Sequence, residues 1–128
     1  MAIGGLTGIA SIPTRDAKAE PEAFPCATTA VLDGDTFDCD GQRIRLQGID
    51  APELPGHCRP GRDCTPGDPY ASTRNLRRLV SWRDVTCRKV DTDHYGRTVA
   101  RCSAGKADLS CAQLDGGYAV RRYGMIWC

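Results

Sequence analysis

The chain has 128 residues, of which 41% are apolar and 26% charged, so length and composition fit one globular domain and exclude a disordered tail or a fibre. No apolar run approaches the roughly 18 residues that a membrane-spanning helix needs, and we expect no membrane association. The 17 basic residues nearly balance the 16 acidic ones, and a formal charge of +1 excludes a general attraction to polyanions.

The N-terminal residues 1–23 are expected to form a flexible tail or the remnant of an export signal, followed by one domain over residues 24–128. Residues 2–12 are small and apolar, and residues 17–19 (Ala-Lys-Ala) resemble a signal-cleavage site. A basic segment before the apolar stretch is missing, so both alternatives stay open.

The first half of the domain has the pattern of short strands separated by tight turns. Residues 24–32 predict a strand, and the Asp-Gly pair at 33–34 is typical of a hairpin turn that leads to a return strand over 36–39. A second Asp-Gly turn at 40–41 precedes a strand over 43–49, in which apolar and polar residues alternate.

The second half begins with a long loop over residues 52–69, which holds five of the eight prolines. Residues 70–80 predict a helix with Leu76, Leu79 and Val80 facing inward and three arginines facing outward. A strand, a turn, a strand and a short helix then follow, at residues 85–90, 93–96, 98–102 and 109–114.

Five short strands and two helices in this order predict an α+β fold that is mainly β. A compact Greek-key barrel suits short strands with frequent turns, and we expect a five-stranded OB-fold with two or more short helices. No internal repeat is visible in the sequence.

Eight cysteines are more than an ordinary cytosolic domain carries, and they indicate a secreted or periplasmic protein stabilised by disulfides. Sequence alone does not fix their pairing. The spacing favours a bridge across each predicted hairpin, one around a short loop and one from the last helix to the C-terminus, in the pairs Cys87–Cys102, Cys26–Cys39, Cys58–Cys64 and Cys111–Cys128. A zinc site is the alternative, although no Cys-x2-Cys spacing supports it.

Charge is unevenly distributed along the chain. Residues 20–53 carry eight acidic residues against two arginines, whereas residues 59–101 carry ten basic residues against five acidic ones. An acidic cluster beside a basic surface suits a metal site that handles a polyanion. The alternative is that these charges lie on solvated faces.

Four acidic residues follow or precede predicted strands. Asp33 and Asp35 lie at the first turn, and Asp50 and Glu53 follow the strand over 43–49. If these strands pair, the carboxylates of Asp35 and Asp50 converge and repel each other unless a cation lies between them. Hard oxygen ligands favour Ca²⁺ or Mg²⁺.

The acids have two other interpretations. An Asp-x-Asp sequence also caps turns, with no metal involved. An EF-hand fits poorly, because Thr36 and Gln47 would then occupy loop positions that require acidic residues.

Two arginines lie where they could face the acids. Arg45 is in the middle of a predicted strand, and Arg97 is at a predicted hairpin tip. A guanidinium group binds phosphate oxygens at two points and stays charged. Two such groups and a divalent cation could hold a phosphodiester and stabilise its transition state. The alternative for each arginine is an ordinary surface salt bridge.

Three ordered segments resemble the staphylococcal nuclease (thermonuclease) family: residues 31–36 (VLDGDT), 45–53 (RLQGIDAPE) and 93–97 (DHYGR). The resemblance extends over about residues 26–123. It implies a five-stranded OB barrel with helices, which agrees with the fold expected above. It also implies Ca²⁺-dependent cleavage of phosphodiester bonds in DNA and RNA, leaving 3′-phosphate ends.

The resemblance implies a ligand set for one Ca²⁺ ion. The carboxylates of Asp35 and Asp50 would bind the ion, together with the backbone carbonyl of Ala51. Asp33 would support these ligands without binding the ion itself.

The resemblance also implies the catalytic residues. Glu53 would be the general base that holds the attacking water. Arg45 and Arg97 would clamp the phosphate, and Arg97 would help the 5′-oxygen leave. Tyr95 and Tyr123 would contact the nucleotide. Because all of the catalytic side chains are present, we expect an active enzyme. We also expect a monomer that prefers single-stranded substrates.

Three features depart from the family pattern. Cys58 and Cys64 could close the loop after Glu53, which would narrow the substrate groove. The chain ends at Cys128, about where the family's C-terminal helix would start. The near-neutral charge predicts weak, salt-sensitive binding to nucleic acid.

Two alternative functions stay open at this stage. The first is a non-catalytic OB module that binds single-stranded nucleic acid or a protein partner, although only 6% of the residues are aromatic. The second is a metal nuclease built on His57 or His94, neither of which lies in a recognisable motif.

Overall fold

The computed structural model describes residues 22–128. The predicted tail or signal remnant therefore lies outside the described residues, apart from its last two positions, and the first strand begins at Ala23. Neither helix in the described part of the chain is long and apolar enough to cross a membrane.

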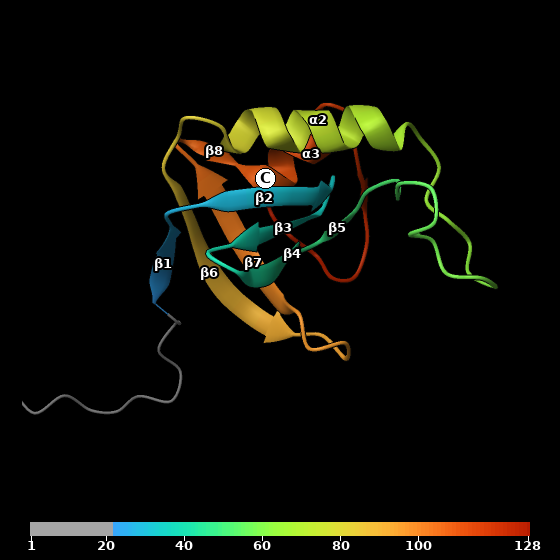
Figure 1. Ribbon diagram of the computed structural model, residues 1–128, viewed down its shortest axis with the longest axis horizontal. Helices are drawn as coiled ribbons and strands as arrows, with labels where there is room; N and C mark the ends of the chain where they lie inside the picture. The colour runs from blue at the N-terminus through green and yellow to red at the C-terminus, as the bar shows by residue number, and fades with distance from the viewer. Residues whose placement is uncertain (1–21) are drawn as a thin grey trace, which may run out of the picture.

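Seven strands form the main sheet, with the bounds β1 Ala23–Cys26, β2 Thr29–Asp33, β3 Thr36–Cys39, β4 Gln42–Leu46, β6 Val85–Thr92, β7 Thr98–Ala104 and β8 Ala107–Asp108. Their spatial order is β1-β6-β7-β4-β3-β2, with β8 paired to β7 (Figure 1). Adjacent strands are antiparallel except for the parallel pair β4–β7. The sheet is open, with β1 and β2 at its two edges.

A second sheet has two strands, β5 Ile49–Asp50 and β9 Val120–Arg121. The two helices are α2 Pro69–Val80 and α3 Leu109–Asp115, and Figure 1 shows α2 lying along one side of the main sheet with α3 beside it. The fold is α+β and mainly β, and its partly open sheet is consistent with the predicted OB-fold.

The strand predicted over residues 24–32 is interrupted, which is one reason why the main sheet has more strands than expected. The carboxylate of Asp40 accepts hydrogen bonds from the N–H groups of Ala27 at 3.0 Å and Thr28 at 2.7 Å. This contact fixes a corner in the chain. As a result β1 pairs with β6, and β2 pairs with β3.

The strand predicted over residues 43–49 also ends early, at Leu46. Gly48 has a φ of +81°, a left-handed conformation that glycine adopts without strain. A Cβ atom at this position would lie 2.5 Å from the side chain of Ile126. The chain therefore turns at Gly48 and enters the separate strand β5, which carries Asp50.

Both predicted helices are confirmed. The side chain of Asp68 accepts from the N–H groups of Tyr70 and Ala71 at the start of α2, and Pro69 occupies the first turn. The side chain of Asp108 caps α3 in the same way. Leucine and valine side chains of α2 pack into a core with Phe37 and other residues of the sheet, as the periodicity predicted.

The four predicted disulfides are confirmed, with Cα–Cα distances of 4.0–5.9 Å, and no cysteine remains free to bind zinc. Cys87 and Cys102 lie directly opposite each other on β6 and β7. The Cys26–Cys39 bridge differs from the expected hairpin bridge, because Cys26 belongs to β1 and pairs with Val85. It joins β1 to β3 across the corner described above.

A buried polar junction fixes the turn between β2 and β3 against both helices. Gln113 of α3 is 0% exposed, and its amide nitrogen donates to the carbonyls of Gly34 at 2.8 Å and Ser72 at 3.0 Å. Its amide oxygen accepts from the side chain of Asn75 at 2.6 Å. Gly34 allows this close approach, since a Cβ atom there would lie 1.8 Å from the hydroxyl of Ser72.

Candidate active site

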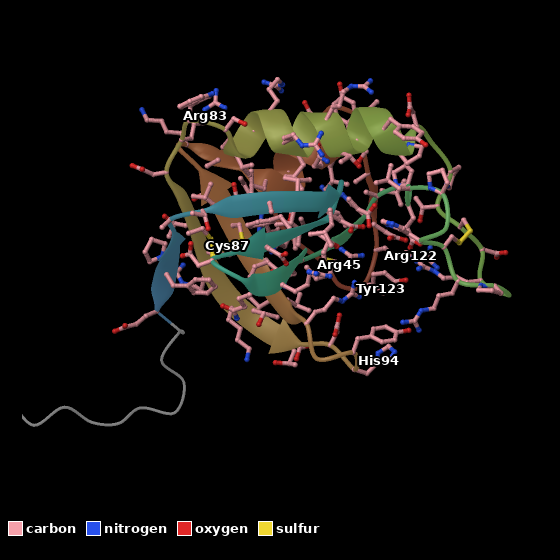
Figure 2. All side chains as sticks on the ribbon, in the orientation of Figure 1. Arg45, Arg83, Cys87, His94, Arg122 and Tyr123 are labelled. Atoms are coloured by element: carbon pink, nitrogen blue, oxygen red, sulfur yellow. A yellow bond between two sulfur atoms is a disulfide. The ribbon has the colours of Figure 1, made fainter. Side chains whose placement is uncertain are left out.

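A pocket of about 530 Å³ contains nearly all of the residues that the sequence predicted for the site. It is bordered by the β2–β3 turn, β4, β5, the loop after β5 and the tip of the β6–β7 hairpin. The predicted residues that line it are Asp33, Asp35, Arg45, Asp50, Glu53, Tyr95, Arg97 and Tyr123. Figure 2 shows Arg45 and Tyr123 close together, with His94 at the nearby hairpin tip.

Arg45 brings the two central carboxylates together. Its Nη2 atom lies 3.4 Å from Asp35 and 3.3 Å from Asp50. Its Nη1 atom donates to the backbone carbonyls of Leu46 and Ile49 at 3.0 and 2.8 Å, which fixes the guanidinium group in place. The structure thus places one buried arginine between two carboxylates from separate turns of the chain.

Asp35 is buried directly after the turn from β2. The N–H of Ala51 donates to one of its carboxylate oxygens at 2.8 Å, and the hydroxyl of Thr36 donates to the other at 2.7 Å. Burial raises the pKa of Asp35 above its usual value, and the charge of Arg45 and these hydrogen bonds offset the rise only in part. Burial thus outweighs the positive charge and the hydrogen bonds around its carboxylate.

Asp50 is 1% exposed and is surrounded by donors. Besides Arg45, its carboxylate accepts from the hydroxyl of Thr65 at 2.6 Å and contacts Arg62 at 3.2 Å and Arg122 at 3.3 Å. Sequence reasoning missed these last three residues. Arg62 belongs to the basic stretch described above, but no motif or periodicity assigned it to the site.

Glu53 has one paired and one unpaired oxygen. Its Oε1 atom lies 2.6 Å from Nη1 of Arg62, whereas its buried Oε2 atom has no hydrogen-bond partner within residues 22–128. Partial burial is the largest single effect and acts to lower the pKa of Arg62, but the interactions with Glu53, Tyr123 and Asp50 together outweigh it and the pKa is raised. Arg62 is therefore firmly charged and bridges Glu53 to Asp50.

Arg97 lies at the base of the hairpin tip and is held by Asp93. The Nε atom of Arg97 donates to Asp93 at 2.6 Å, and the N–H groups of Tyr95 and Arg97 donate to the other carboxylate oxygen at 3.0 and 2.9 Å. Burial acts to raise the pKa of Asp93, but these hydrogen bonds and the charge of Arg97 lower it overall. The hairpin tip thus presents a fixed, partly exposed guanidinium group to the pocket.

The two predicted tyrosines lie at the exposed edge of the pocket. The guanidinium group of Arg59 lies 3.8 Å from the centre of the Tyr95 ring and also contacts its hydroxyl. Arg45 and Arg122 lie 5.8 and 5.2 Å from the centre of the Tyr123 ring. Tyr123 is 62% exposed, whereas the Tyr95 ring already has the guanidinium group of Arg59 over it.

Asp33 and the two histidines lie away from the central carboxylates. Asp33 contacts Nδ1 of His57 at 3.2 Å and accepts from the N–H of Leu54 at 3.4 Å. The ring of His94 packs against that of Tyr95, with centroids 4.0 Å apart. Within residues 22–128, no group of three or more histidine, cysteine or acidic side chains is arranged to hold a metal ion as it stands. Instead, arginine guanidinium groups contact carboxylate oxygens of Asp35, Asp50 and Glu53.

Residues 43–126 match the family model described as "Staphylococcal nuclease homologue", which is more than half of the chain. The chain belongs to this family. It is 34% identical over 121 residues to the "Succinoglycan biosynthesis protein ExoI" of Rhizobium meliloti (strain 1021), covering 92% of this chain and 62% of that protein. It is 33% identical over 89 residues to the "Probable endonuclease LCL3" of Yarrowia lipolytica (strain CLIB 122 / E 150), covering 65% of this chain and 37% of that protein. The chain therefore spans less than two thirds of the length of each relative.

Proposed function

We propose that this chain is a calcium-dependent, sugar-nonspecific nuclease that hydrolyses phosphodiester bonds of DNA and RNA to products with 3′-phosphate ends. Membership of the nuclease family and the similarity to a probable endonuclease support the general class. The observation that carries the proposal is a single pocket in which Asp35, Asp50 and Glu53 lie with Arg45 and Arg97.

The oxygen atoms of the pocket fit one hard divalent cation. Asp35 and Asp50 contact the same nitrogen of Arg45, so their carboxylates are close enough to share an ion after small side-chain shifts. Glu53 adds a buried oxygen without a hydrogen-bond partner in the described chain. Asp35, Asp50 and the carbonyl of Ala51 would hold the ion, with oxygen ligands of the kind that Ca²⁺ prefers. Bound there, Ca²⁺ would polarise a phosphoryl oxygen.

Each remaining side chain has a role in an in-line displacement. Oε2 of Glu53 accepts a proton from water, whose oxygen attacks phosphorus while the bond to the 5′-oxygen breaks. Arg45 binds a non-bridging oxygen, and Arg97 stabilises the leaving 5′-oxygen. The phosphate stays on the 3′-oxygen. Asp33 supports the loop after β5 through Leu54 and His57.

The pocket also favours a substrate with accessible bases. Tyr95 and Tyr123 are half-exposed or more, and their rings can stack on unpaired bases at the two sides of the scissile phosphate. We therefore propose a preference for single-stranded DNA or RNA, bound by a monomer. Four disulfides support a secreted or periplasmic location, because such bonds persist in oxidising compartments.

The proposal is tested by cleavage of a single-stranded oligonucleotide with Ca²⁺ or with a chelator. Glu53→Gln should lower kcat by about 10²–10⁴-fold, because it removes the general base. Oligonucleotide binding should persist in this variant. Asp63→Asn, which removes an exposed carboxylate from the same loop, is the matched control and should cleave normally.

Three outcomes would contradict the proposal. Equal cleavage by the wild type, Glu53→Gln and Arg97→Ala would end the site assignment. Binding without cleavage under all conditions would favour the non-catalytic OB module. Loss of activity in His94→Ala, with Glu53→Gln fully active, would favour a histidine-based metal nuclease.

A further inference from the structure

The loop between β5 and α2 places a guanidinium group on the acidic centre of the pocket. Nη1 of Arg62 lies 2.6 Å from Glu53, and Nη2 lies 3.2 Å from Asp50. Arg62 thus contacts the proposed general base and a proposed cation ligand at the same time. None of the motifs that carry the family resemblance includes this residue.

A cation bound to Asp50 would meet this positive charge directly. Asp50 already has Arg45 on one oxygen, and Thr65, Arg62 and Arg122 on the other. Like charges at such short distances repel strongly where water is largely excluded. A divalent ion therefore requires that at least one guanidinium group withdraws.

Arg62 is the group whose withdrawal would free both acids. Arg45 is only 10% exposed and also donates to two backbone carbonyls, so β4 holds it in place. Arg122 is 43% exposed and can also withdraw, but it contacts Asp50 and not Glu53. The side chain of Arg62 is 30% exposed, and its guanidinium group bonds to no backbone carbonyl within residues 22–128. Its carboxylate partners are the two acids themselves.

The loop keeps Arg62 beside the pocket when it is displaced. Cys58 and Cys64 are disulfide-bonded on either side of it, with their Cα atoms 5.9 Å apart. Arg59, in the same closed loop, lies over the ring of Tyr95 on the opposite hairpin. Both contacts restrict how far the backbone of Arg62 can move.

We propose that Arg62 competes with the divalent cation for Asp50, so that the cation binds by displacing the guanidinium group of Arg62 from Asp50 and with it from Glu53. This inference rests on the proposed function, because it concerns the same acidic site. Without cation, Arg62 neutralises the acids and keeps Glu53 paired. With cation, Glu53 is released toward water, and Arg62 turns to the rim of the pocket, where a substrate phosphate can take the place of the carboxylates.

The test is calorimetric titration of Ca²⁺ into the disulfide-bonded chain without nucleic acid. Arg62→Ala should bind Ca²⁺ roughly 10-fold more tightly than the wild type, which is the change expected when a competing close ion pair is removed. Arg62→Gln should behave similarly while it preserves most of the side-chain volume. Arg59→Ala is the matched control, because it removes the same charge from the same loop without touching the acids, and its Ca²⁺ affinity should stay within about twofold of the wild type.

The outcomes separate this inference from the proposed function. If the wild type binds Ca²⁺ and both Arg62 variants bind it equally or more weakly, the competition is refuted while the proposed function stands. An equal gain in Arg59→Ala and Arg62→Ala also refutes it, since the effect would then come from general charge. If neither the wild type nor any variant binds Ca²⁺, the calcium dependence of the proposed function falls, and the competition falls with it.

Discussion

Two groups of arginines in this chain have opposite surroundings. In or beside the pocket, Arg45, Arg62, Arg97 and Arg122 each lie within 3.4 Å of a carboxylate oxygen, whereas Arg59 contacts Tyr95 instead. On the outer face of α2, a shallow groove of about 590 Å³ is lined by Arg74, Arg77 and Arg78, together with Asn75 and Tyr118. Within residues 22–128, none of these three helix arginines forms an ion pair, and Arg78 bonds only to the side chain of Asn75.

Positive charge therefore has two different roles in a chain of net charge +1. The four arginines in or beside the pocket that contact carboxylates neutralise them. They therefore affect both the stability of the fold and the net charge of the pocket. The helix arginines are hydrated, and their charge acts mainly at a distance through solvent. Figure 2 shows Arg122 on the same side of the molecule as Arg45 and Tyr123, and Arg83, just after α2, at the opposite end.

The largest expected effect is on Arg45. Arg45→Ala should lower the free energy of unfolding by about 3–5 kcal/mol, because it leaves Asp35 and Asp50 buried beside each other without their shared partner. Urea denaturation at pH 7 with a chelator measures this change. Arg43→Ala is the control on the same strand, since its ion pair with Asp38 is exposed and is worth at most about 1 kcal/mol. A similar loss of unfolding free energy in both variants would mean that the buried ion pairs of Arg45 stabilise the fold no more than the exposed pair of Arg43.

An intermediate effect is expected from two acids of the pocket whose pKa values shift in opposite directions. The pKa of Asp35 is raised, so the folded chain binds more protons than the unfolded chain in the window above the ordinary value of 3.8. The free energy of unfolding therefore falls as the pH rises through this window. Asp35→Asn should raise the free energy of unfolding at pH 7 in the absence of a divalent cation.

The pKa of Asp93 is lowered, so the sign reverses. Its contribution to stability is complete above the ordinary value of 3.8 and is lost as the pH falls through its folded value. Asp93→Asn should lower the free energy of unfolding by about 2 kcal/mol at pH 7, because charge-assisted hydrogen bonds to Arg97 and Tyr95 weaken. Urea denaturation from pH 3 to pH 8 measures both variants. If Asp35→Asn and Asp93→Asn change the free energy of unfolding in the same direction at pH 7, the opposite pKa shifts do not explain their effects.

The smallest effect is expected on α2. The double substitution Arg74→Ala with Arg77→Ala should change the free energy of unfolding by no more than about 0.5 kcal/mol, because both side chains are exposed and have no carboxylate partner in the described part of the chain. Thermal and urea denaturation measure the change. A loss above about 1 kcal/mol would mean that these arginines stabilise the fold through contacts, as the pocket arginines do.

The sequence predicted elements whose cause is local. Hairpin turns with Asp-Gly, the proline-rich loop and the amphipathic helix α2 each follow from neighbouring residues, and all are present. Cys87 and Cys102 could be paired because their positions are symmetric about one turn. The division of the first strand was missed because it depends on the carboxylate of Asp40, which is twelve or more residues away from the N–H groups that it accepts from.

The difference between local and long-range causes also explains which residues of the pocket could be predicted. The acids and Arg45 were found because they lie within or beside strands whose pairing is predictable, and the family motifs include them. Arg62 lies in a loop of prolines and glycines, where neither period nor register indicates where a side chain points. Its position depends on the three-dimensional course of that loop, and Thr65 was missed for the same reason. Arg122 lies after β9, in a C-terminal segment for which the sequence predicted no helix or strand.

Gln113 links the helices to the chemistry of the pocket. Its amide connects α3 to α2, through Asn75 and Ser72, and to the turn whose next residue is Asp35, through Gly34. Leucine at this position would leave the carbonyl of Gly34 without the donor that Gln113 supplies. The turn that leads into Asp35 is therefore tied to a buried residue of α3 that does not itself line the pocket.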